Sequence, residues 1–114
     1  MRKSKYRNKT CFAGGLKFDS IAESKRYLEL KALVQAGEIT DLDLQVKFEL
    51  IPKVTICGRN QRACYYVCDF QYVKDGKTVV EDVKGFATDV YKIKRKLMKH
   101  VHGIDVVEIR RGVR

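Results

Sequence analysis

Two aspartates and a lysine lie in segments that are otherwise rich in apolar residues. Asp82 and Lys84 lie among valines in "VVEDVKGF" (79–86), and Asp69 lies in "ACYYVCDFQYV" (63–73). Burying one charge alone costs several kcal/mol, so each of these side chains needs a partner. Two carboxylates and an amine at close range could hold a divalent cation with oxygen ligands, and magnesium is the usual choice.

The turn between the two segments decides which carboxylates meet. If Asp75 and Gly76 form a two-residue hairpin loop, Asp69 lies opposite Asp82, with Cβ atoms ~5 Å apart. A three-residue loop would set Asp69 against Glu81 instead. Like charges directly opposite each other destabilise a sheet, so either register predicts a pair of carboxylates that needs compensation.

Lys84 lies two residues after Asp82 and shares its face of the strand. The alternative is a solvated ion pair on the outer face of a hairpin, which needs no ligand. Two features weigh against that alternative: the apolar neighbours of both acids, and Gly85, where the backbone can open to a ligand.

The elements that must position these residues follow from hydrophobic periodicity and turn signals. They are a hairpin at 10–18, a helix at 19–37, a strand at 42–50, a loop at 57–62, strands at 63–73 and 77–85, a helix at 88–103 and a strand at 104–109. The order is α-β-β-β-α-β after the hairpin, which predicts an α/β (α+β) domain with a mixed central sheet flanked by two helices.

Capping signals and apolar spacing mark the two helices. In the first, Ser20 is the expected N-cap and Gly37 the stop, and the residues expected to face the core are Tyr27, Leu30 and Val34. In the second, Thr88 or Asp89 caps the helix and Gly103 ends it. Its expected apolar stripe consists of Val90, Ile93, Leu97 and Val101.

Composition limits the remaining possibilities. The 114 residues predict a single domain (1–114), of which 1–9 form a basic tail, and the net charge of +10 favours nucleic acid as the partner. Without a membrane-length apolar run or a signal-peptide block we expect a soluble cytoplasmic protein with no membrane partner. The four cysteines have no CxxC spacing, so reduced thiols are expected, with a zinc site as the alternative.

Asp69 followed by Asp82-Val83-Lys84 at the end of a hairpin resembles the signature of the PD-(D/E)xK nuclease superfamily, with Cys68 in place of the proline. The α-β-β-β-α-β order is similar to the restriction-endonuclease-like core. The chain from "KYRNKT" to "VVEI" most resembles small phage-encoded members. The stretch "GEITDLDLQVKFELIP" is similar to transposon-end-cleaving nuclease subunits and very short-patch repair nucleases.

The resemblance implies a catalytic set of Glu23, Gln45, Asp69, Asp82 and Lys84. It implies that Glu23, Asp69, Asp82 and the Val83 carbonyl hold Mg²⁺, for which Mn²⁺ can substitute. Glu23 has a second interpretation, because "SIAE" at 20–23 is typical of a capping box in which Glu23 reaches back to the Ser20 amide.

The basic second helix is expected to bind the DNA backbone. Its cations are Lys92, Lys94, Arg95, Lys96 and Lys99. The implied function is a magnesium-dependent DNA endonuclease acting on double-stranded or branched DNA in phage recombination, and small members of the superfamily that work as dimers suggest a homodimer. The alternatives are a catalytically inactive nucleic-acid-binding module and, with least support, a ribonuclease.

Overall fold

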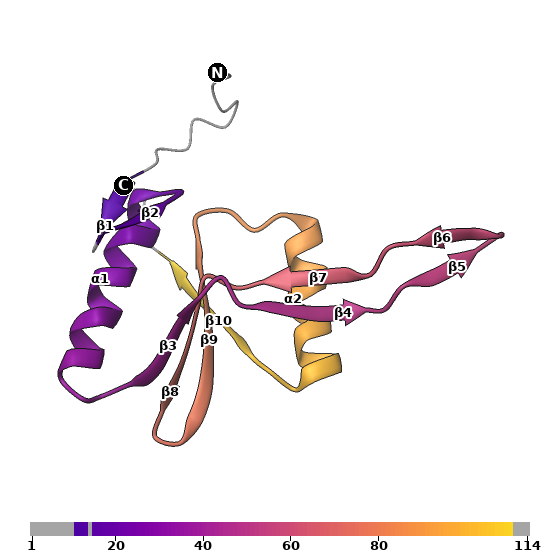
Figure 1. The fold of residues 1–114 in the computed structure, drawn as a ribbon. Helices are drawn as coiled ribbons and strands as arrows, with labels where there is room; N and C mark the ends of the chain where they lie inside the picture. Colours follow the sequence, from indigo (N-terminus) through magenta and orange to yellow (C-terminus); the bar gives the residue numbers. More distant parts are fainter. Residues whose placement is uncertain (1–10, 14, 111–114) are drawn as a thin grey trace.

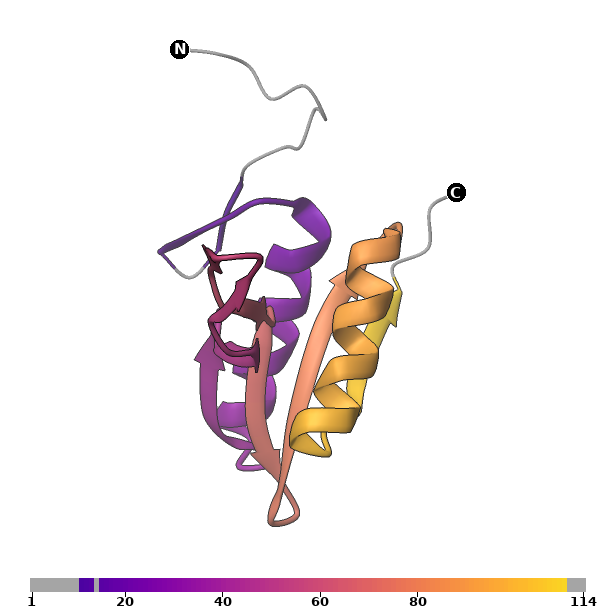
Figure 2. The same ribbon diagram turned by 90° about the vertical axis from the view of Figure 1, so that its right-hand side faces the viewer.

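A four-stranded mixed sheet lies between two helices in the computed structural model, which describes residues 11–13 and 15–110 (Figures 1 and 2). The helices are α1 (Ile21–Gln35) and α2 (Asp89–His102). The strands are β1 (Cys11–Ala13), β2 (Leu16–Phe18), β3 (Thr40–Leu44), β4 (Lys47–Ile51), β5 (Val54–Ile56), β6 (Arg59–Gln61), β7 (Cys64–Val67), β8 (Phe70–Lys74), β9 (Lys77–Lys84) and β10 (Val106–Arg110). The predicted α+β class and the small N-terminal hairpin, β1–β2, are confirmed.

The main sheet has the strand order β10-β9-β8-β3. The pairs β3–β8 and β8–β9 are antiparallel, while β10 runs parallel to β9 after the α2 crossover. The core elements therefore follow the predicted order, α1-β3-β8-β9-α2-β10. Neither helix in the described part of the chain is long and apolar enough to cross a membrane.

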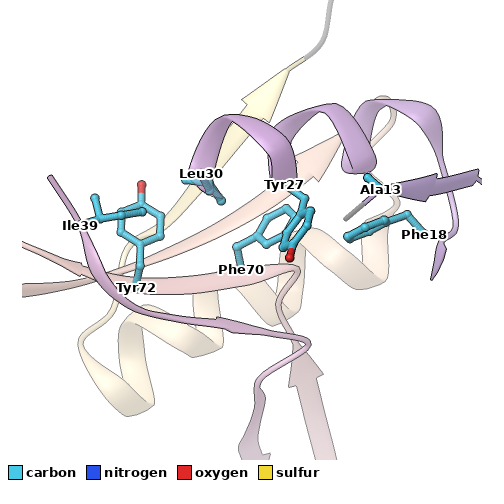
Figure 3. Close-up of a cluster of buried hydrophobic side chains, with 7 residues drawn as sticks. All are labelled: Ala13, Phe18, Tyr27, Leu30, Ile39, Phe70 and Tyr72. Atoms are coloured by element: carbon cyan, nitrogen blue, oxygen red, sulfur yellow. The ribbon is translucent and has the colours of Figure 1, made fainter. Parts of the chain in front are cut away.

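The face of the sheet under α1 carries an aromatic core (Figure 3). Tyr27 and Leu30 of α1 lie over Phe70 and Tyr72 of β8, and Tyr27 also packs against the Phe18 ring, with centroids 5.0 Å apart. Both helical residues were expected to be in the core and both are buried. Ser20 caps α1 as predicted, its Oγ accepting from the Glu23 N–H at 3.1 Å.

The other face packs against α2, but of the predicted stripe only Leu97 takes part, as a partly buried residue. Val90, Ile93 and Val101 are 62%, 57% and 46% exposed, whereas Tyr91 and Met98 are buried. Tyr91 and Met98 are seven residues apart, two helical turns, so they lie on one face of α2, next to the partly buried Leu97. The prediction of the caps was correct, since Thr88 begins α2 and Gly103 ends it with φ 70°.

The β8–β9 hairpin has the two-residue loop that places Lys74 opposite Lys77. Asp75 and Gly76 both have positive φ, 52° and 76°, as a type I′ turn requires. The register is therefore the one that predicted Asp69 next to Asp82, although the ladder itself ends at the pair Phe70–Glu81 and Asp69 lies just beyond it.

Two strands predicted as continuous are each broken in two. The strand expected at 42–50 divides into β3 and β4 around Gln45, whose φ is 55°, and the one expected at 63–73 divides into β7 and β8 around Cys68 and Asp69. Apolar alternation continues through both breaks, so the sequence pattern cannot reveal that the chain changes direction there.

Beyond these breaks, β4 to β7 form a two-stranded arm (residues 47–67) that projects from the body of the molecule (Figure 1). The predicted loop at 57–62 is wrong: β5 and β6 form a hairpin closed by Cys57 and Gly58, both with positive φ. A cysteine in the first turn position lacks the Asn-Gly or Asp-Gly signal, so the turn could not be recognised.

Candidate active site

The residues singled out from the sequence meet where the arm leaves the sheet. On β9, the ladder with β8 reaches Glu81 opposite Phe70, while the ladder with β10 continues to Lys84. The last residues of β9 therefore keep a strand neighbour on one side only. We call the opening formed by Asp69, Asp82, Val83 and Lys84 the notch.

Asp69 takes the place of the missing strand neighbour. Its Oδ2 accepts a hydrogen bond from the Val83 N–H at 2.8 Å, and its own N–H donates to the Glu81 carbonyl at 3.2 Å. On its other side, the Asp69 carbonyl accepts from the Gln45 N–H at 3.1 Å. Backbone contacts on both sides thus fix the carboxylate at the edge of the notch.

Asp82 lies next to it, only 4% exposed. The Tyr66 hydroxyl donates to Asp82 Oδ2 at 2.5 Å, and the Lys84 Nζ lies 3.4 Å from Asp82 Oδ1. Lys84 also lies over the ring of Tyr91, 4.0 Å from its centroid. The ammonium group is therefore held between a carboxylate and an aromatic face at the mouth of the notch.

Glu23 reaches the same place from the first turn of α1. Gln45 Nε2 donates to Glu23 Oε2 at 3.3 Å. The positive φ of Gln45 turns its backbone out of β3 where the arm departs. The helix acid and the glutamine implied by the family resemblance thus contact each other beside the notch.

The carboxylates of this group influence one another electrostatically. Burial, and then the hydrogen bond and charge of Asp82, raise the pKa of Asp69 well above its ordinary value. Burial and the charges of Asp19 and Asp82 raise the pKa of Glu23. Burial and the bond to Asp82 raise the pKa of Tyr66, which remains a donor at every physiological pH. The notch therefore has an excess of negative charge that a proton or a cation must neutralise.

A cavity of about 380 Å³ opens at the notch. Asp69, Asp82, Lys84 and Lys94 line it, together with three tyrosines. Within residues 11–13 and 15–110, no group of three His, Cys, Asp or Glu side chains is placed to hold a metal ion. Two neighbouring carboxylates nevertheless suit Mg²⁺, which keeps several waters and binds through one or two carboxylates and a substrate phosphate.

The five cations predicted on α2 do not share one side of the helix. Lys94 lines the cavity of the notch. The others line a separate hollow beside β10: Lys92, Arg95, Lys96 and Lys99. Within that hollow Arg95 pairs with Glu108 at 3.2 Å and Lys99 with Asp105 at 3.1 Å.

Glu81, the other carboxylate considered as a partner for Asp69, lies on the opposite face of β9. It is 1% exposed, and Arg26 donates to both of its carboxylate oxygens, at 2.9 and 2.7 Å. The Tyr72 hydroxyl donates to it as well. This buried bidentate pair joins α1 to the sheet and has no part in the notch.

Two tyrosines that support the residues of the notch were not identified from the sequence. Tyr66 contacts Asp82 although the two lie 16 residues apart, and Tyr91 supports Lys84 from α2. For Tyr66 the available signal was a tyrosine in an apolar strand, whose buried hydroxyl usually finds a partner. Tyr91 gave no such signal, since it lies on α2 and its buried hydroxyl has no hydrogen-bond partner among the described residues. Among the cysteines that the structure describes, Cys57, Cys64 and Cys68 have free thiols, as expected.

Comparison with known proteins assigns the chain to a family without assigning an activity. No curated protein and no solved structure matches it. Residues 3–110 match the model of a family described as "Protein of unknown function (DUF1064)". Since the match spans nearly the whole chain, the protein belongs to the DUF1064 family.

Proposed function

We propose that this protein is a magnesium-dependent DNA endonuclease of the PD-(D/E)xK type, acting on double-stranded or branched DNA. The observation that carries the proposal is the pairing of Asp69 and Asp82 at a strand break, with Lys84 at the mouth of the same opening. A fold has no structural need for two neighbouring carboxylates in a half-open cavity, and their mutual charge costs stability.

The donor set fits a magnesium ion. Asp69 and Asp82 would hold it, with the Val83 carbonyl as a further oxygen donor, and Glu23, which the structure does not place with them as a third ligand, would contribute through a water. Such an ion supplies Lewis-acid chemistry, which neutralises charge on a phosphate and makes water more acidic. The pKa of Asp69 is raised, so this carboxylate tends to retain a proton that neutralises the charge of the pair. A bound cation would neutralise the same charge, and the raised pKa therefore supports this fit.

The remaining residues have supporting roles. Lys84 would stabilise negative charge that develops on the scissile phosphate. Tyr66 fixes the orientation of Asp82, and Gln45 fixes that of Glu23. Lys94, on the helix beside the cavity, would contact the DNA backbone.

The order α1-β3-β8-β9-α2-β10 supports the same assignment, because it is the order of the restriction-endonuclease-like core once the arm is treated as an insertion between β3 and β8. The basic composition, +10 over 114 residues, favours a polyanionic substrate.

The test is cleavage of end-labelled Holliday junction, flap, duplex and single-stranded DNA, with Mg²⁺, with Mn²⁺ and with EDTA. We expect metal-dependent products from at least one double-stranded or branched substrate. Binding without cleavage under every condition would favour the inactive binding module, and cleavage of RNA alone would favour the ribonuclease.

A further inference from the structure

We infer that the arm (residues 47–67) is a DNA-binding ribbon whose β5–β6 end enters the major groove of duplex DNA beside the notch. The inference rests on the proposed function for the identity of the substrate. It adds a DNA contact surface beyond the notch and the cations of α2.

The end of the arm has almost no core of its own. Every residue from 51 to 62 is exposed, and Val54 and Ile56 leave 40% and 57% of their surface open. An isolated two-stranded hairpin is only marginally stable in water. The base of the arm joins the core through Leu50 and Tyr66, whereas its end, residues 51–62, neither builds the core nor covers the sheet and is well suited to contact another molecule.

The arm is also strongly basic. It carries four cations and one acid, Glu49. The cations are Lys47, Lys53, Arg59 and Arg62. Lys47 lies over the ring of Tyr65, 4.1 Å from its centroid. None of the four has an ion-pair partner among the residues that the structure describes. Unpaired exposed cations attract a polyanion without first breaking an existing pair.

The side chains on β6 are those that read base edges. Arg59 and Gln61 of β6 project on the same face as their cross-strand partners Ile56 and Val54, and arginine suits guanine while glutamine suits adenine. Asn60 projects on the other face, where its Oδ1 accepts a hydrogen bond from the Thr55 hydroxyl at 2.9 Å. Neighbouring strands lie about 4.8 Å apart, so such a ribbon fits a major groove that is ~12 Å wide in B-DNA. The major groove of double-stranded RNA is too narrow.

The arm is continuous with the notch. A hollow runs along it, lined by Tyr65, the acid Glu49 and three cations, Lys47, Lys53 and Arg62. Tyr65 also lines the cavity that contains Asp69 and Asp82. β7 leads directly into Asp69. A duplex seated with one phosphate in the notch would therefore extend along the basic hollow to the ribbon.

The experiment compares two triple variants with equal charge. Lys53→Ala/Arg59→Ala/Arg62→Ala removes three of the four cations of the arm, and Lys25→Ala/Lys31→Ala/Lys74→Ala removes three exposed lysines of α1 and β8. Binding to a fluorescent 20-bp duplex is measured in EDTA over a series of salt concentrations. We expect the arm variant to bind at least ~10-fold more weakly at moderate salt, with a log–log slope reduced by about 0.9 for each lost phosphate contact. The control should retain the wild-type slope, and equal slopes for both variants would overturn the inference.

The wild-type protein tests the groove independently of any variant. Bound protein should protect guanine N7, which faces the major groove, from dimethyl sulfate at one patch of the duplex. An RNA duplex of the same sequence should bind more weakly. Absence of protection, or equal affinity for RNA, would contradict groove entry.

These measurements need no cleavage, so failure of the inference and failure of the proposed function are distinguishable. If the protein binds duplex DNA through the arm but cuts no substrate, the inference about the arm holds and the proposed nuclease function is wrong. If the protein cuts DNA but the arm variant binds DNA as tightly as the wild type, the nuclease function holds and the inference about the arm is wrong.

Discussion

In the notch, Asp69 and Asp82 are packed side by side, with Tyr66, Lys84 and the Val83 amide fixing their positions. In the arm, cations stand in solvent without ion-pair partners among the described residues. Buried charge costs stability and is held in one geometry, whereas exposed charge costs little and acts over about a Debye length. The two regions are therefore suited to different tasks, chemistry in the notch and affinity in the arm.

The sharpest test of this division is Asp82→Asn, for which we expect the largest effect. Loss of a metal-binding carboxylate should reduce cleavage by more than the ~10²-fold that is typical for loss of an outer-shell partner. DNA affinity should be equal or better, because one negative charge near a phosphate has been removed. Gel-based cleavage and fluorescence anisotropy measure the two quantities, and near wild-type cleavage would refute the assignment of the notch.

Glu23→Gln separates the ligand role of Glu23 from its place in the first turn of α1. Glutamine keeps the cap and can still contact Gln45, so the melting temperature should change little. Cleavage at low magnesium should fall by about 10–100-fold, with partial recovery at high magnesium. Full activity at every magnesium concentration would leave Asp69, Asp82 and Lys84 as the whole site.

Lys94 and Lys96 test which side of α2 belongs with the notch. Lys94→Ala should reduce the slope of log affinity against log salt by about 0.9, the contribution of one phosphate contact. Lys96→Ala, a matched change in the hollow beside β10, should leave the slope unchanged. The reverse result, a slope reduced by Lys96→Ala and not by Lys94→Ala, would show that DNA lies along the β10 side of α2. The DNA contacts of α2 would then be separate from those of the arm.

The smallest expected effect concerns stability. An aspartate with a raised pKa keeps its proton in the folded protein after the unfolded chain has released it. Stability of the metal-free protein therefore declines as pH rises from the ordinary aspartate pKa, about 3.9, toward the raised pKa of Asp69. Asp69→Asn removes this loss and keeps an oxygen for the Val83 amide.

Thermal unfolding in EDTA measures how the stability of the metal-free protein depends on pH. We expect the melting temperature of Asp69→Asn to exceed that of the wild type by ~4 °C above neutral pH, corresponding to ~1 kcal/mol, and to match it near pH 3.5. Added Mg²⁺ should stabilise the wild type more than the variant. A variant that is less stable at all pH values would show that the carboxylate pair carries no electrostatic penalty.

Local signals were sufficient where neighbours along the chain determine the structure. Ser20 and Thr88 begin their helices, Gly103 ends one, and Asp75-Gly76 closes the hairpin in the predicted register. Each depends on backbone groups only a few residues away. This register already brought Asp69 and Asp82 together, and alternation added Lys84 to the same face.

Partners distant in the chain were not predictable from these patterns. Apart from Leu97, the α2 stripe was misassigned because Val90 and Tyr91 both begin plausible apolar faces, and only the sheet determines which one is buried. Tyr66 and Gln45 became part of the site through contacts 16 and 22 residues away in the chain. The turn at Cys57 lacked its usual residues, so the arm was not foreseen.

The sequence by itself determined the two capped helices, the β8–β9 register and the identity of the acids and lysine, because caps, turns and alternation act over short distances. Tertiary structure alone decided that two long strands break at Gln45 and Asp69, which opens the notch and releases the arm. The physical reason is that apolar and polar residues alternate in the same way on both sides of each break. Whether the chain continues in one sheet or leaves it depends on the surfaces against which it packs. The strands before and after the arm pack against α1 and β9, and the base of the arm packs against α2.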